Sequence, residues 1–91
     1  MYDEEAVKAF QPVERIVQAF NLPLILQRKF TGILNAMEMQ FEDGRWDERV
    51  LDALQSALLS LTDAVGVSHQ RRDLEQALQR FRAHLRQRRS L

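Results

Sequence analysis

The last part of the chain, residues 68–91, reads SHQRRDLEQALQRFRAHLRQRRSL, and its pattern indicates how the chain folds. Its apolar side chains recur at helical spacing and form one narrow seam, made of Leu74, Leu78, Phe81 and Leu85. This spacing is typical of a helix that packs by one edge, although it is too short for a free-standing coiled coil. Seven arginines and two acids accompany the seam. The segment therefore predicts a helix that docks by one edge and offers cations along another.

Most of these arginines fall on one side of the predicted helix. At about 100° per residue, five of them share an arc of about 100°, and we name Arg71, Arg72, Arg82, Arg86 and Arg89 the arginine edge. We expect this edge to meet carboxylates of a protein partner. Two other interpretations stay open: contact with nucleic-acid phosphates, or a surface that only keeps the helix soluble and complements its dipole. Glu75 lies in the same arc and can pair with Arg71 or Arg72.

The rest of the sequence predicts three more helices and no strands, because no segment alternates with period two. The fold class is therefore an all-α, small four-helix bundle-like domain, with helices at about residues 3–20, 23–41, 47–65 and 68–88 of a single domain 1–91. Pro12 should kink or break the first helix. Asp47 should cap the third helix, and Gly66 should end it. We expect the core to be built from the second and third helices, with the other two packed across them.

The second helix has an additional apolar side. Its main face includes Phe30 and Phe41. Another flank carries a second set of apolar and small residues, namely Ile25, Gly32, Ala36 and Met39. Glycine inside a helix costs about 1 kcal/mol relative to alanine, and close approach by another helix is a common reason for it. We expect the first helix of the same chain to cover this flank, with a homodimer contact as the alternative.

Charge and composition limit the classes of protein to consider. The net charge is zero, yet residues 1–52 carry ten acids and six bases, whereas residues 53–91 carry three acids and seven bases. The two halves can complement each other within one fold or between two copies, or the basic half can face an anion. The chain has no cysteine and an acidic start, and its longest apolar run is residues 24–26. We therefore expect a cytoplasmic protein with no membrane segment.

Catalytic and metal-binding patterns are missing from the sequence. The only histidines, His69 and His84, stand fifteen residues apart among arginines, with no second ligand at helical spacing. No nucleophile motif and no glycine-rich phosphate loop occur. We expect no catalytic residue, no metal and no cofactor.

These observations predict a small protein-protein interaction module, such as an adaptor, an anti-activator or an assembly or regulatory factor. It would bind through a helix face and the arginine edge to a protein partner, which could be acidic, or to a second copy. The alternative is a nucleic-acid-binding protein that sets the arginine edge on phosphates. Zero net charge disfavours that alternative, and so does the lack of an aromatic residue interleaved with the arginine edge, because Phe81 belongs to the apolar seam.

Overall fold

A computed structural model describes residues 4–42, 46–66 and 68–90, with the side chains of Glu42, Ser68 and residues 88–90 left outside the description. Over this part the chain forms four helices and no strand, which confirms the all-α fold class. The helices are α1 (Glu4–Gln18), α2 (Leu24–Glu42), α3 (Glu48–Val65) and α4 (Ser68–Ser90). Each begins and ends close to its predicted bounds.

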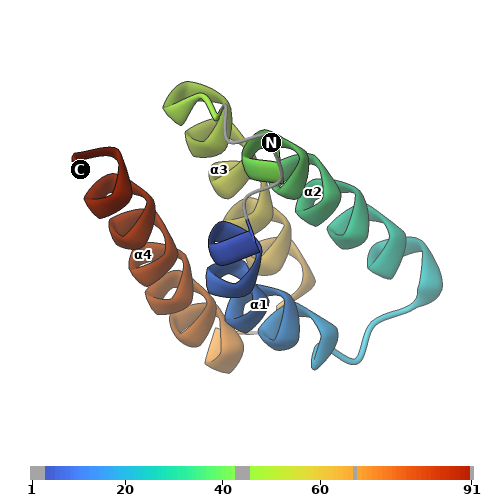
Figure 1. The fold of residues 1–91 in the computed structure, drawn as a ribbon. Coiled ribbons are helices and arrows are strands. Elements are labelled where there is room, and N and C mark those ends of the chain that lie inside the picture. Colours follow the sequence, from blue (N-terminus) through green and yellow to red (C-terminus); the bar gives the residue numbers. More distant parts are fainter. Residues whose placement is uncertain (1–3, 43–45, 67, 91) are drawn as a thin grey trace.

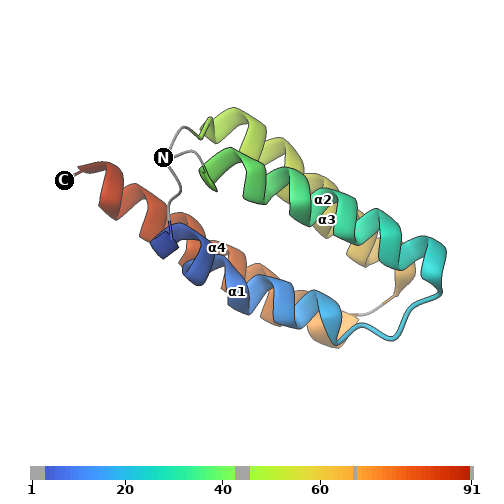
Figure 2. The same cartoon turned by 45° about the vertical axis from the view of Figure 1, so that its right-hand side comes forward.

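The four helices run up and down and contact one another in a ring. Among the described residues the backbone of α1 lies close to α2 and α4, and that of α3 lies close to the same two helices. The diagonal pair α2 and α4 meets only through side chains, at Phe41 and Phe81. Figure 2 shows two layers, one made of α1 and α4 and the other of α2 and α3. The bundle measures 39 × 21 × 21 Å, and Figure 1 shows the four helices and the segment that joins α1 to α2 at one end.

Local signals at the helix ends act as predicted around α3. The side chain of Asp47 accepts a hydrogen bond from the backbone N–H of Arg49 at 2.8 Å, which satisfies one free donor of the first turn. Gly66 ends the helix with a φ of 76°, a left-handed conformation that glycine adopts at little cost. In α1, by contrast, Pro12 lies inside one uninterrupted helix, so no separate helix starts there. A kink at Pro12 stays a prediction.

The core receives side chains from all four helices, so our expectation of a core built from α2 and α3 was wrong. Every seam residue of α4 is buried, and α3 buries fewer apolar side chains than α1 or α4. Phe10, Phe41 and Phe81 join α1, α2 and α4, with ring centroids 5.0 to 5.2 Å apart. The apolar stripe of α3 is wider than a helix with two neighbours can bury, and its outer edge reaches solvent at Val50.

Candidate interaction surfaces

The arginine edge of α4 faces α3 rather than open solvent along much of its length. Arg71 stands at the start of this contact. Its Nε donates to Asp63 Oδ1 on α3 at 2.6 Å, and its Nη1 donates to Glu75 Oε2 on α4 at 2.6 Å. The hydrogen bond and the charge of Asp63, followed by the charge of Glu75, raise the pKa of the Arg71 guanidinium above its ordinary value. Arg71 is therefore already neutralised by carboxylates of its own chain.

Arg82 does not belong to an exposed edge. Its side chain is only 6% exposed, and its Nη2 lies 2.7 Å from Asp52 Oδ1 in an ion pair poorly angled for a hydrogen bond. Its Nη1 donates to Gln55 Oε1 at 3.2 Å. The arc of about 100° placed Arg82 beside the other arginines correctly, but α3 covers that part of the arc. A partner could reach this guanidinium only by displacing α3.

The remaining members of the edge differ from one another. Arg86 Nε lies 3.7 Å from Glu48 Oε1 on α3, with two thirds of its side chain exposed. Arg72 is exposed. Arg89 lies on α4, but its side chain is outside the described residues. The contacts of Arg71, Arg82 and Arg86 thus follow the length of α3. Arg82 and Arg86 pair with acids of residues 1–52, so at these two positions the basic half of the chain meets the acidic half, whereas Arg71 pairs within its own half.

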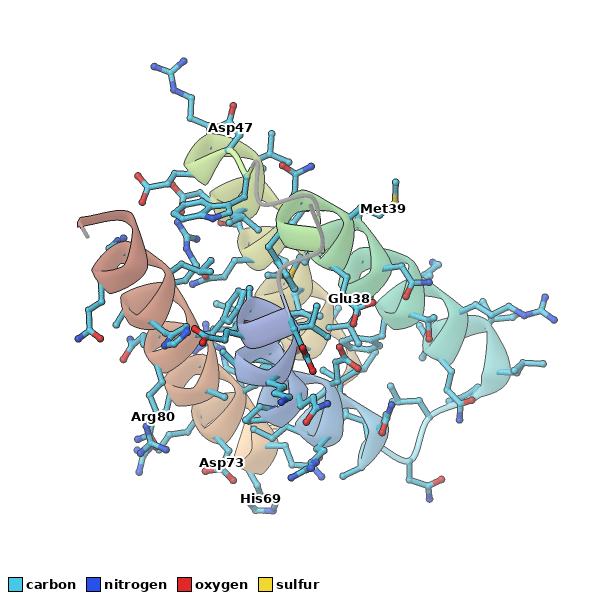
Figure 3. All side chains as sticks on the ribbon, viewed as in Figure 1. Glu38, Met39, Asp47, His69, Asp73 and Arg80 are labelled. Carbon is cyan, nitrogen blue, oxygen red and sulfur yellow. The ribbon has the colours of Figure 1, made fainter. Side chains whose placement is uncertain are left out.

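The outer flank of α2 is open to solvent. Ile25 is 71% exposed and Met39 is 68% exposed, and Figure 3 shows Met39 pointing away from the bundle. Gly32 is also exposed, and a Cβ atom built on it meets nothing within 4 Å. Ala36 is partly buried. Successive members of this set are seven, four and three positions apart, so they form one stripe that turns by only about 20° per seven residues.

Over the ranges that the structure describes, no helix covers this stripe, so the expectation that α1 packs on it was wrong. α1 packs on a different side of α2, where Phe30, Leu34 and Glu38 face it. The sequence pattern located two apolar sides of α2 but did not determine which of them faces the other helices of the bundle. Among the described residues, no neighbour lies close enough to Gly32 to require a glycine there.

Further exposed residues of α2 and α3, which include apolar side chains and bases, were not singled out from the sequence. The large apolar side chains that the described residues expose are Leu24, Ile25, Met39 and Val50, and all of them belong to α2 or α3. Three exposed bases lie on the same two helices, namely Arg28, Lys29 and Arg49. No described carboxylate forms an ion pair with any of these three. We name this surface, from Leu24 to Val50, the α2–α3 face.

A pair of acids between α1 and α2 was also not predicted from the sequence. Glu14 on α1 meets Glu38 on α2, although the two are far apart in the sequence. Burial, together with the hydrogen bond and the negative charge of Glu38, raises the pKa of Glu14 to about 7. Oε1 of Glu14 is buried, and no described residue forms a hydrogen bond with it. Many acids occur at helical spacing on amphipathic helices, so the sequence pattern could not identify this pair.

Metal ligands do not gather among the described residues: no three histidine, cysteine or acidic side chains stand close enough to hold an ion. Likewise, none of the four helices, over the ranges described, is long and apolar enough to cross a membrane. Comparisons with protein-family models, curated proteins and solved structures found no match to this chain.

Proposed function

We propose that this chain is a small cytoplasmic protein-interaction module, an adaptor, anti-activator or assembly factor, that docks an acidic amphipathic helix of a partner protein on the α2–α3 face. The observation that carries the proposal is that the large apolar side chains exposed by the described residues, Leu24, Ile25, Met39 and Val50, all belong to two helices that contact each other. Exposed apolar side chains that cluster, rather than scatter, mark sites of protein association.

The shape of the face suits a helix. α2 has 19 residues, which corresponds to about 28 Å at 1.5 Å per residue. With α3 about 8–10 Å away, the two helices offer a shallow strip as long as a partner helix of five turns. The absence of a side chain at Gly32 lets a partner backbone approach α2 closely, as small residues do at other helix contacts.

The charges on the face favour an acidic partner. Arg28, Lys29 and Arg49 have no carboxylate beside them among the described residues. A second copy would bring the same cations to the contact, where they repel, whereas an acidic helix would neutralise them. The arginine edge contributes less to the proposal, because Arg71 and Arg82 already contact acids of the chain.

Site-specific photo-crosslinking in host cells tests the proposal. A benzophenone amino acid at Ile25 or Met39 should give a protein adduct, and the same group at Gln79, which is exposed on α4, should not. The cross-linked segment, identified by mass spectrometry and made as a peptide, should be helical and acidic. It should bind the purified chain with an affinity that falls at high salt.

Variants then decide whether the contact is specific. Met39→Glu and Ile25→Glu should each weaken peptide binding at least tenfold, and the matched control Gln79→Glu should leave it unchanged. The proposal fails if adducts form only between two copies of the chain or if the variants bind as well as the parent. It also fails if the chain binds duplex nucleic acid or anionic vesicles through its cations but no acidic helix.

A further inference from the structure

A cavity of about 250 Å³ lies between α1 and α2, on the opposite side of α2 from the exposed stripe. Phe20 and Phe30 form its apolar part, with ring centroids 5.4 Å apart in an edge-to-face arrangement. Both rings are almost fully buried. The size is near the lower end for small-molecule pockets in proteins, so the cavity suits a small ligand.

Polar side chains line the cavity along its length. Glu14 and Glu38 line it from opposite helices, and Gln18, Gln27, Thr31 and Asn35 add amide and hydroxyl groups. Gln27 is held in place because its Nε2 donates to the backbone oxygen of Leu22 at 2.8 Å. Figure 3 shows Glu38 between the ribbons of α1 and α2. No basic side chain is among the lining residues.

We propose that this cavity binds a small organic cation, an ammonium or guanidinium compound, between the carboxylates of Glu14 and Glu38 and the rings of Phe20 and Phe30. Two facing carboxylates without a base are a poor way to close a helix contact, but they provide a strong site for one positive charge. The apolar part of the lining can take the carbon chain of the ligand.

The buried Oε1 of Glu14 supports this ligand class. A buried oxygen without a hydrogen-bond donor is costly and rare in native proteins, and the N–H groups of an ammonium or guanidinium ion are the donors it lacks. Divalent metals fit less well, because the described residues offer no third histidine, cysteine or acidic side chain near the pair. The ligand would therefore enter as a cation with N–H donors rather than as a metal ion.

Protonation of the acid pair couples to such binding. The charged lining residues are Glu14 on α1 and Glu38 on α2, and the cavity lining includes no residue of α3 or α4. The pKa of Glu14 is raised to about 7 by burial and by Glu38, so at pH 6 the pair retains a proton that a cation would have to displace. The affinity for a cation should therefore rise about tenfold between pH 6 and pH 8.

The experiment is an NMR titration of the intact chain with butylammonium, agmatine and tetramethylammonium, using butyrate as the control of opposite charge. We expect at least one cation to shift the backbone amides of Gln18, Thr31 and Asn35 in a saturable way, with tighter binding at pH 8. Butyrate should produce no such shift. Binding of butyrate as tightly as butylammonium, or of calcium or magnesium in place of the organic cations, would overturn the proposal.

Isosteric variants separate the charge from the fold. Glu14→Gln and Glu38→Gln should each weaken cation binding at least tenfold and remove its pH dependence, while the helical circular-dichroism signal stays unchanged. Asp73→Asn is the matched control, because Asp73 lines a different groove, between α1 and α4. Unchanged binding in both glutamine variants, or no response of the parent to tens of millimolar of any of the cations, contradicts the assignment. This outcome leaves the proposed function untouched, since the α2–α3 face lies elsewhere on the bundle.

Discussion

Arg82 on α4 and Asp52 on α3 form an ion pair with unequal ends: the guanidinium side chain is 6% exposed, while the carboxylate side chain is 66% exposed. The cation thus gives up its water, whereas the acid keeps most of its own. Removing the acid leaves a guanidinium that still contacts Gln55. Removing the base eliminates the buried charge itself together with the packing of its long stem.

Substitution of Arg82 should therefore depend on the shape of the new side chain. Arg82→Ala should lower the free energy of unfolding by about 1–3 kcal/mol, because it leaves a cavity between α3 and α4 and leaves Gln55 without its partner. Arg82→Met fills most of that space without a charge and should cost less than Arg82→Ala. Urea denaturation followed by circular dichroism measures both. An equal loss in the two variants would show that the charge, not the packing, is what matters.

The Glu14–Glu38 pair should make the fold less stable as pH rises. The raised pKa of about 7 means that the folded state holds a proton which the unfolded chain, with a pKa near 4.5, releases earlier. The contribution of Glu14 to the free energy of unfolding is therefore largest below about pH 4.5, and it is lost between pH 4.5 and pH 7. Allowing for solvent screening, we expect a loss of about 1–2 kcal/mol over that window.

Glu14→Gln provides the control for this pH dependence. It removes one titrating carboxyl and keeps its size, so the fall in the urea midpoint between about pH 5 and pH 8 should flatten in the variant. Glu5→Gln, at an exposed position nearer the start of α1, should keep the slope of the parent. A parent protein that gains stability across this window would contradict the assigned pKa.

Two glycines should respond to alanine in opposite directions. Gly32 is helical and has open space where a Cβ would stand, so Gly32→Ala should raise the free energy of unfolding by about 0.5–1 kcal/mol. Gly66 has a φ of 76°, which alanine adopts at a cost, so Gly66→Ala should lower it by about 1 kcal/mol. Thermal unfolding of the two variants side by side measures the contrast, and a loss in Gly32→Ala would point to a neighbour at that position.

The aromatic contact between α1, α2 and α4 should contribute more to stability than any polar contact. Phe81→Ala should cost about 3–5 kcal/mol, because it removes a fully buried ring that touches both Phe10 and Phe41. That is a large part of the total for a chain of this size. Phe81→Leu keeps most of the volume and should cost clearly less. Chemical denaturation with a common baseline compares them.

The helix positions and their caps were predictable because they depend on local chemistry. Apolar spacing places Leu74, Leu78 and Leu85 on one side of α4 in any helical context, and the cap at Asp47 depends only on its own backbone turn. The order of helices around the ring was not predictable in the same way. α2 has two apolar sides, and only the packing of the whole chain determines that the side with Ile25 remains exposed.

The interaction surfaces were predictable only in part, for the same reason. The arc calculation collected Arg71, Arg82 and Arg86 correctly, yet it could not show that acids of α3 lie opposite them. The pairing of Glu14 with Glu38 depends on the relative height of two helices, which a single sequence does not give. Both features are contacts between two helices, and the spacing of residues along one helix carries no information about such contacts.

The two boundaries between the layers have opposite electrostatic character. Where α3 meets α4, the arginines face acids and attract them; where α1 meets α2, two acids face each other and repel. Added salt screens both effects, so it loosens the first boundary while it relaxes the second. In a bundle with zero net charge these two opposite effects can cancel, so that the melting temperature scarcely responds to ionic strength. Only a probe placed at each boundary would then register the change at that boundary.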